Sequence, residues 1–549
     1  MWIQELRNAF HGLRSAPGFT ITAILSLSLG IGGSVSMFTL VNSVLLKPLA
    51  YPDSGRLVRV TNAYTAAYAS ARKGADTPGL LALEFTRWRK QVQSLDSLAL
   101  VRYGFESSLT GTSRPERLGT VYVTAEYFDT LKVQPQLGRW FREAEEQRGS
   151  PSVAIISDSF WRRSFAARSD IVGRTIHIDG VPYEVVGVAP PALGSFRNQE
   201  WHPSLEMVRE VDVFLPNRFT PHQLQSDTAD EFVGIARLKP GVTLEQARAE
   251  LDSTLTSIPE YQAAFNTLKV RVDLQELQTA VVSEARSGLM LLLLSVGLVL
   301  LIGCVNVANL SLVRSSQRGR EFAIRVALGA SRSNLIRYSL AESFLVAAAG
   351  TIVGSILSQW ITDLAINRAP RLPRTNEIAT DATVLCFAVG ICILTTFLFG
   401  AIPAWRASRV DPREGLSSAS RGSTDTLRGG HIRAGLIAAE VALGVVLVTG
   451  SGLLLRSFHQ VMNAPRGFDG HDVLISELYL STESYRPIER QVSFFRRLHD
   501  DLSSRPGVLH VAVNTRTPLN GEAIYAVFEE NSAKPLNELT PASWPNVTE

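Results

Sequence analysis

The residues best suited to act on another protein lie in one basic segment, 320–332, between two long apolar stretches. Glu321 and Arg325 are four residues apart, so a helix brings their charges together, while Ile324 and Leu328 share an apolar face. Gly329 is typical of a helix end. We interpret the segment as a short docking helix, with the site residues Arg320, Glu321, Ile324, Arg325, Leu328, Gly329 and Ala330. The alternative is a solvated connector whose charges only set the membrane topology.

Patterns for catalysis and cofactor binding are missing from the sequence. No glycine is followed by lysine, so the chain lacks the G-x-x-x-x-G-K-[ST] loop that holds the phosphates of ATP. Cys304, Cys386 and Cys392 all fall in apolar stretches and do not have the spacing of metal ligands. We therefore expect no enzyme activity, cofactor or metal, and the net charge of +3 gives no indication of nucleic-acid binding.

Five nearly uncharged stretches are each long enough to cross a bilayer, which takes about 20 apolar residues in a helix. The predicted spans are residues 19–46, 287–313, 338–361, 382–405 and 434–455. The chain of 549 residues is 45% hydrophobic and 19% charged, which excludes a disordered chain, and the spans exclude a soluble cytoplasmic enzyme. We expect an α-helical membrane protein with α+β domains outside the membrane.

Residues 1–18 are predicted to contain an amphipathic helix. The apolar residues that recur there at helical spacing are Trp2, Leu6, Phe10 and Leu13. Pro17-Gly18 interrupts the pattern, so the helix is expected to end there and to lie in the membrane interface. The alternative is a charged flank to the first span, because the segment is short.

Basic residues near the span ends predict the orientation, because Lys and Arg are disfavoured on the translocated side. Arginines are concentrated in segments 314–337 and 406–433, which indicates that both segments and the N-terminus are cytoplasmic. Residues 47–286 and 456–549 are then extracytoplasmic. Three arginines in a short outer loop run against this rule, namely Arg368, Arg371 and Arg374.

The first extracytoplasmic region is predicted to be α+β. Ile176 and Ile178 alternate with polar residues before Asp179-Gly180, a pair that favours a type I′ turn, so residues 175–188 are expected to form a hairpin. A strand is expected at 231–238, followed by a helix that Thr243 and Gln246 begin as a capping box.

The two outer regions share an internal repeat. A strand, a helix and a strand are expected at 57–61, 80–93 and 98–103, and again at 473–480, 488–502 and 508–513. The second copy is expected to be an incomplete domain, and the chain to be a fragment or an early-terminated product.

The second span is expected to extend outward as a stalk. Leu274, Leu277 and Val281 continue the helical spacing of the span, and a helix from Leu274 to Val313 would be about 60 Å long. The alternative is a separate short helix that ends at a flexible break, Ser287-Gly288.

Two acidic residues lie within the predicted spans, where an unpaired charge is costly. Glu342 and Glu440 both fall near the cytoplasmic ends, close to Arg337 and Arg433. We interpret them as members of interfacial ion pairs, not as a proton relay.

Several longer stretches resemble one family, the FtsX/MacB-like permeases of ABC transporters. REFAIRVALGA at 320–330 is similar to the coupling helix of that family, and PAWRASRVDPREGL at 403–416 also matches it. The family's periplasmic core domain is resembled by YFDTLKVQPQLGRWF (127–141), IISDSFWRRSF (155–165) and GRTIHIDGVPYEVVGV (173–188). The order of spans and domains resembles the duplicated permeases of the acidobacterial type, of which this chain would be the N-terminal two thirds.

The resemblance implies a permease subunit in the inner membrane of a bacterium, coupled through residues 320–332 to a separate cytoplasmic ATPase. It also implies mechanotransmission, in which ATP-driven closure of the ATPase moves the spans, and these move the outer domains. Other expected partners are membrane lipid and either a second permease copy or the missing C-terminal half. The alternative is an ATPase-independent membrane sensor or scaffold that binds an envelope ligand.

Overall fold

The computed structural model describes residues 2–64, 79–111, 116–194, 211–225, 232–256, 270–317, 331–368, 374, 377–407, 427–463, 472–476, 478, 480, 485, 487–513, 524–527 and 540–543. The chain divides into two compact units. The helical unit comprises Met1–Lys47 and Glu284–His471, and the α+β unit comprises Pro48–Ser283 and Asp472–Glu549.

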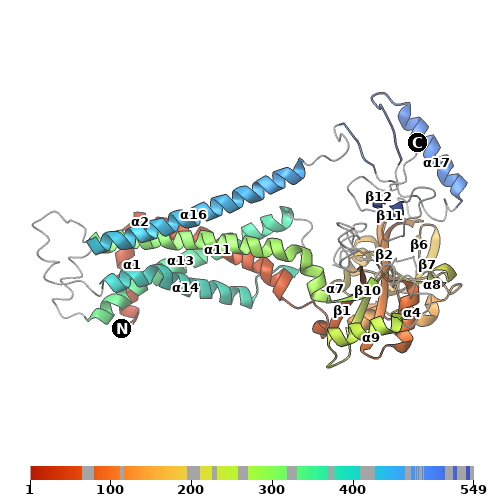
Figure 1. Ribbon diagram of the computed structural model, residues 1–549, viewed down its shortest axis with the longest axis horizontal. Helices are drawn as coiled ribbons and strands as arrows, with labels where there is room; N and C mark the ends of the chain where they lie inside the picture. Colours follow the sequence, from red (N-terminus) through yellow and green to blue (C-terminus); the bar gives the residue numbers. More distant parts are fainter. Residues whose placement is uncertain are drawn as a thin grey trace, which may run out of the picture. The chain divides into compact units, whose positions relative to one another are not determined.

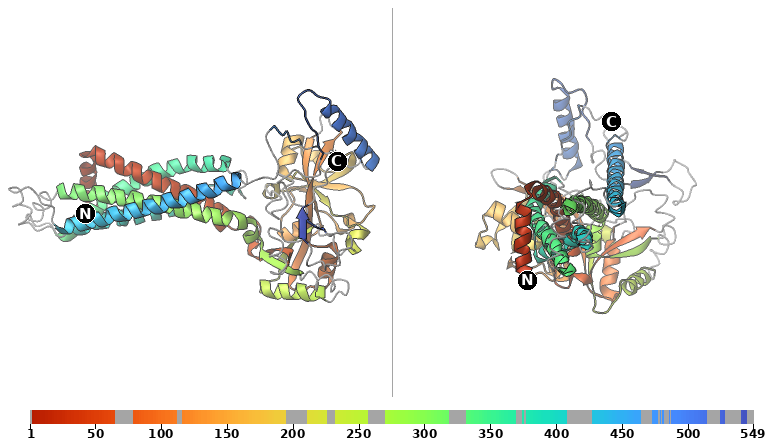
Figure 2. Two further views of the ribbon diagram at one scale, coloured as in Figure 1. Left: turned by 45° about the horizontal axis from the view of Figure 1, so that its top comes forward. Right: turned by 90° about the vertical axis from the view of Figure 1, so that its left-hand side faces the viewer.

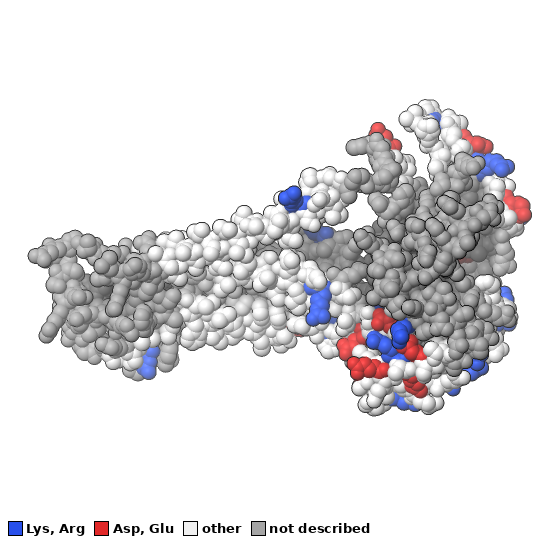
Figure 3. Space-filling view, in the orientation of Figure 1, with Lys and Arg blue, Asp and Glu red and all other residues white. Residues whose placement is uncertain are grey.

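Membrane-length helices make up the helical unit (Figures 1 and 2). Its described helices are α1 (Trp2–Arg14), α2 (Pro17–Val41) with a π-helical turn η1 (Asn42–Leu46), α11 (Leu277–Gln317), α13 (Arg332–Arg368), α14 (Ala382–Ala407) and α16 (Leu427–Met462). Five helical stretches are long and apolar enough to cross a membrane: Pro17–Leu46, Ala285–Arg314, Ser333–Arg368, Ala382–Gly400 and Ala434–Met462. The five predicted spans are thus confirmed. In Figure 3 the described surface along these helices is almost free of charged side chains except towards its two ends.

Helix α2 crosses α13 closely through a pair of glycines. A Cβ atom on Gly32 would lie 2.8 Å from the carbonyl oxygen of Gly354, and one on Gly354 would lie 2.9 Å from the amide nitrogen of Gly32. Because no side chain separates the two backbones, the helices pack by direct van der Waals contact. The buried apolar core of this bundle includes Leu27, Ile31, Leu300, Val346 and Phe399.

Helix α1 packs against α13 through Leu6 of the predicted stripe and through Ala9, which lies outside that stripe. Ala9 is fully buried in a cluster with Leu335, Tyr338 and Ala341 of α13, whereas Phe10 is 58% exposed. The predicted amphipathic helix is present, but Phe10 does not belong to its packed face. The spacing of large apolar residues missed Ala9, whose small side chain lets the two helices approach closely.

The predicted stalk is one unbroken helix through Ser287-Gly288. Helix α11 has 41 residues, which corresponds to about 60 Å. It begins at Leu277, not at Leu274, because Leu274 belongs to strand β10 (Val270–Glu276), where it pairs with Val60. The alternative of a break in the helix is therefore wrong.

The larger described sheet of the α+β unit is mixed and has ten strands. The strands after β10 run in the order β1 (Leu57–Tyr64), β9 (Phe232–Leu238), β2 (Leu95–Thr110), β3 (Glu116–Val123), β8 (Val213–Pro216), β5 (Val153–Ile156), β7 (Val181–Val188) and β4 (Leu137–Gly138), while β6 (Thr175–Ile178) pairs with β2 and β7. The described helices that accompany the sheet are α4 (Ala82–Gln91), α5 (Tyr127–Leu131), α6 (Asp158–Phe165), α7 (Pro191–Gly194), α8 (Pro221–Gln225) and α9 (Leu244–Thr256), with a 3₁₀ turn, η3 (Glu143–Glu146).

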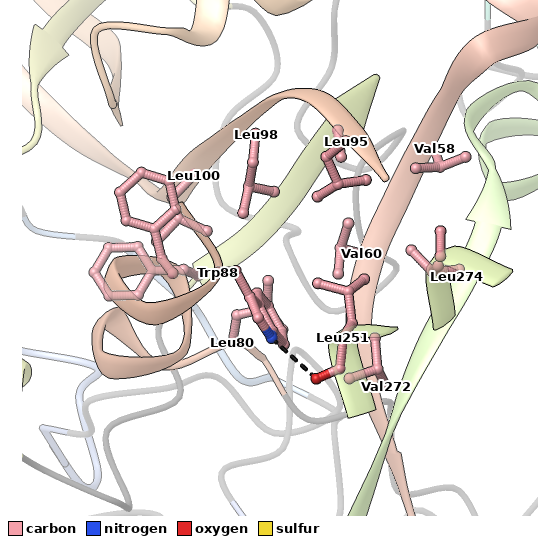
Figure 4. Close-up of a cluster of buried hydrophobic side chains, with 14 of the residues drawn as sticks. Val58, Val60, Leu80, Trp88, Leu95, Leu98, Leu100, Leu251, Val272 and Leu274 are labelled. Carbon is pink, nitrogen blue, oxygen red and sulfur yellow. Dashed lines mark hydrogen bonds between the residues drawn. The ribbon is translucent and has the colours of Figure 1, made fainter. Parts of the chain in front are cut away.

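The described residues of this unit include two apolar clusters. In the first, α4 and α9 bury side chains against β1, β9 and β10 (Figure 4). Trp88 of α4 lies at its centre, 1% exposed, and its indole N–H donates a hydrogen bond of 3.2 Å to the carbonyl oxygen of Leu251. The second cluster joins α6 to β5, β7 and β8 through residues such as Ile156, Phe160 and Val213.

The local predictions for this unit are confirmed. Strands β6 and β7 form the expected hairpin, and Asp179 and Gly180 have φ values of 52° and 84°, as a type I′ turn requires. Thr243 and Gln246 form the expected reciprocal capping box before α9.

The second copy of the repeat is confirmed only in its helix. Helix α17 (Ile488–Ser503) matches the predicted helix, and a separate hairpin is formed by β11 (Ile524–Val527) and β12 (Thr540–Ser543). The described residues of the predicted strands, 473–476, 478, 480 and 508–513, are not in strands. A strand requires a hydrogen-bonded neighbour, and within the described part of the chain nothing pairs with these residues as β1 pairs with β9 and β10 in the first copy.

Candidate functional site

The predicted docking residues, from Arg320 to Ala330, all lie outside the described residues. The structure does define the two helices that this segment joins, since α11 ends at Gln317 and α13 begins at Arg332. Ser331 immediately precedes α13, and its hydroxyl accepts a hydrogen bond of 3.4 Å from the amide of Asn334. The described geometry of this region is therefore that of its two flanking helices.

Arg314, in the last turn of α11, joins several helices at the base of the segment. Its guanidinium lies 2.6 Å from the carboxylate of Glu342 on α13 and donates a hydrogen bond to the carbonyl oxygen of Gly12 on α1. Its carbon Cζ also lies 4.7 Å from the ring centre of Phe19 on α2, which is a cation–π distance. One side chain thus contacts three other helices.

The two acidic residues within the spans both have cross-helix partners. The prediction placed Glu342 close to Arg337 of its own helix, and the structure places Arg314 of α11 on its carboxylate. Glu440 on α16 accepts hydrogen bonds of 2.6 and 3.2 Å from the side-chain amide of Asn306 on α11, in the amide orientation that satisfies both groups. The predicted partner of Glu440 was Arg433, whose side chain lies outside the described residues.

The Arg314–Glu342 pair is not among the predicted contacts, because an arginine at the end of a span also serves as a topology signal. The available signal was an arginine at the end of one span and a glutamate inside the next, at similar membrane depth.

One arginine of the predicted outer loop is part of the bundle. Arg374 is 5% exposed and donates hydrogen bonds to the carbonyl oxygens of Lys47 at 2.6 Å and Val44 at 3.3 Å. It also pairs with Glu377 at 2.7 Å. The carbonyl groups that end η1 thereby gain a donor, so this arginine has a structural reason to lie in the loop.

The α+β unit contains a charged cluster around Arg89 of α4. Arg89 pairs with Glu126, with Glu143 at 3.0 Å and with Glu146 at 4.0 Å, so it links α4 to the start of α5 and to η3. Burial raises the pKa of Glu146 to about 7, and the nearby carboxylates of Glu126 and Glu143 also raise it. The amide of Ala125 and the charge of Arg89 act in the opposite direction.

This raised pKa predicts a pH-dependent stability. Between about pH 4.5 and pH 7 the folded protein keeps a proton on Glu146 that the unfolded chain has lost, so stability falls as the pH rises through this window. We expect the Glu146→Gln variant to be more stable than wild type at pH 8 by on the order of 2 kcal/mol, and to gain little at pH 4.5. Thermal unfolding of the full chain at both pH values measures the difference.

Glu143→Gln is the matched control, because Glu143 belongs to the same cluster but its side chain is 73% exposed. Equal pH profiles for wild type and Glu146→Gln would contradict the assignment.

The described residues contain no group of three or more His, Cys, Asp and Glu side chains arranged to hold a metal ion. In the helical unit, polar contacts link α11 to α13, α1 and α16 near the segment between α11 and α13.

Comparisons with known proteins identify two regions of the chain. The MacB-like periplasmic core domain family matches residues 20–254, and the FtsX-like permease C-terminal family matches residues 293–412. The pyoverdine export ATP-binding/permease protein PvdT of Pseudomonas syringae pv. tomato is 27% identical over 286 residues, which are 51% of this chain and 40% of that protein. The macrolide export ATP-binding/permease protein MacB of Salmonella paratyphi A is 27% identical over 295 residues, 54% of this chain and 42% of that protein. The chain thus spans about two fifths of the length of these relatives.

Among solved structures, the periplasmic region of MacB from Actinobacillus actinomycetemcomitans is similar to this chain, with a TM-score of 0.30 and 14% identity over 43% of this chain and 94% of that one.

Membrane-length helices combined with a MacB-like periplasmic core domain are the architecture of a multi-pass membrane protein. The chain belongs to the FtsX/MacB-like family of ABC transporter permeases, proteins of the bacterial inner membrane.

Proposed function

We propose that this chain is the mechanotransmitting permease subunit of an ABC transporter. ATP-driven motion of a separate cytoplasmic ATPase acts on residues 320–330, the membrane helices carry that motion, and the periplasmic core domain uses it in efflux or another envelope process. The N-terminus and the segments 314–337 and 406–433 are cytoplasmic in this proposal, and residues 47–286 and 456–549 are extracytoplasmic.

The observation that carries this proposal is the position of the segment. Residues 320–330 lie within the region matched by the FtsX-like permease family and join α11 directly to α13. Helix α11 continues unbroken to Leu277, immediately after strand β10 of the core domain sheet. A displacement at its cytoplasmic end therefore has a covalent helical path to that sheet.

Arg374 supports the proposed orientation. Its position in an outer loop runs against the positive-inside rule, but the side chain is buried and held by the carbonyl groups of Val44 and Lys47. A structural requirement thus accounts for one of the three arginines in this loop.

We expect the Leu328→Asp variant to insert normally but to stimulate the ATPase at least about tenfold less than wild type. Leu328 is on the predicted apolar face of the docking helix, and a carboxylate there would have to be desolvated in the contact. The measurement begins with purification of the full chain in mild detergent and identification of the nucleotide-binding subunit that co-purifies. The ATPase rate of the reconstituted complex is then compared with that of the ATPase alone.

Val326→Asp is the matched control, because helical spacing places Val326 on the face opposite Leu328. Glu321→Arg tests the predicted pair with Arg325 in the same assay. Unchanged stimulation by Leu328→Asp and Glu321→Arg would contradict the docking role, and repeated absence of any ATPase would favour a sensor or scaffold.

A further inference from the structure

The contacts of Arg314 are concentrated at the base of the proposed docking segment. Arg314 lies within one turn of the end of α11, and Glu342 lies in the third turn of α13, so the ion pair joins the two helices that carry the segment. The side chains of Arg314 and Glu342 are only 12% and 18% exposed. A shielded pair is weakly screened, and loss of one partner leaves the other charge uncompensated.

Helix α1 supplies a second connection between the same helices. Its carbonyl group at Gly12 accepts a hydrogen bond from Arg314, while its buried Ala9 packs against Leu335 and Tyr338 in the first turns of α13. Helix α1 is therefore bound to the end of α11 and to the beginning of α13. Helix α1 thus contacts both helices that flank the docking segment but does not belong to that segment.

The chemistry of these contacts requires arginine. The planar guanidinium places Nη1 2.6 Å from the Glu342 carboxylate as an ion pair, donates a hydrogen bond from Nη2 to the Gly12 carbonyl oxygen, and has its carbon Cζ 4.7 Å from the ring centre of Phe19. A lysine ammonium keeps the charge but has no planar fork to satisfy two acceptors and an aromatic ring together.

We propose that Arg314 is a positioning residue that, with Glu342 and helix α1, holds the ends of α11 and α13 at a fixed separation. Displacement of the docking segment then moves the two helices as one body. We call Arg314, Glu342 and helix α1 together the clamp. The clamp is a property of the helices, so this inference rests on the proposed function only for the source of the displacement.

Distances between spin labels test the clamp directly in the full chain. After replacement of the three native cysteines by alanine, labels are attached at the exposed positions Leu310 of α11 and Phe344 of α13. A second pair joins Phe10 of α1 to Phe344. We expect Arg314→Met and Glu342→Gln to broaden both distance distributions, and Arg314→Lys to give an intermediate width.

Arg286→Met is the control, because Arg286 is an exposed arginine on the same helix, far from the clamp in sequence. If the Arg314→Met variant does not insert into the membrane, the distance distributions of Glu342→Gln decide the test. Unchanged distributions in the variants that insert would overturn the clamp.

ATPase stimulation separates the clamp from the proposed function. We expect Arg314→Met to lower stimulation about tenfold although residues 320–330 are intact. Broadened distances with full stimulation would show that Arg314 does not position the segment for coupling. If the wild-type chain stimulates no ATPase, the proposed function fails, and the distance measurement still decides whether the clamp exists.

Discussion

Replacement of Gly354 by leucine should separate α2 from α13 and destabilise the helical unit by about 3 kcal/mol or more. A Cβ atom at this position meets the amide nitrogen of Gly32 at 2.9 Å and the carbonyl oxygen of Ser28 at 3.0 Å, and both are backbone atoms that cannot rotate away. The measurement is the temperature at which the full chain, purified in mild detergent, is no longer monodisperse. This temperature should be lower for the variant than for wild type.

Gly390→Leu is the matched control for this substitution. Gly390 also lies in a membrane-length helix, α14, but a Cβ atom there meets nothing within 4 Å. Leucine has a higher helix propensity than glycine, so this control should be neutral or slightly stabilising. Equal thermal stability of the Gly354 and Gly390 variants would show that the close crossing does not hold the bundle together.

Replacement of Trp88 by alanine should cost about 3–5 kcal/mol in the α+β unit, the usual range for loss of a buried large aromatic side chain. Trp88 fills the space between α4, α9 and the sheet, and its indole N–H donates a hydrogen bond to the carbonyl oxygen of Leu251. Truncation removes the apolar contacts and leaves that carbonyl without its donor. Hydrogen exchange of the full chain should show faster exchange in β1, β9 and α9.

Trp88→Phe separates the two contributions, because it keeps most of the apolar volume but not the hydrogen bond. It should give a smaller effect, of about 1–2 kcal/mol. Trp360→Ala, at a side chain that is 73% exposed on α13, should leave exchange in the α+β unit unchanged. Wild-type protection in Trp88→Ala would contradict a central role for this residue.

The pattern of nearby residues was enough to predict several elements. The five spans follow from long uncharged stretches, the β6–β7 hairpin from Asp179-Gly180, and the start of α9 from Thr243 and Gln246. Each of these depends on residues within a few positions of one another, so the physical cause can be seen in the sequence itself. In the described residues of the predicted strands 473–480 and 508–513 no strand forms, since a strand also needs a partner from elsewhere in the chain.

Contacts between distant residues were decided by the tertiary structure. The sequence alone determined that this protein has membrane spans, an α+β outer domain, and a basic segment with the pattern of a family docking helix. Only the fold decided that Arg314 meets Glu342 and Gly12, that Gly32 meets Gly354, and that Arg374 is buried. The reason is that local propensity acts over a few residues, whereas these pairs form only when packing of the helices brings together parts of the chain that are far apart in sequence.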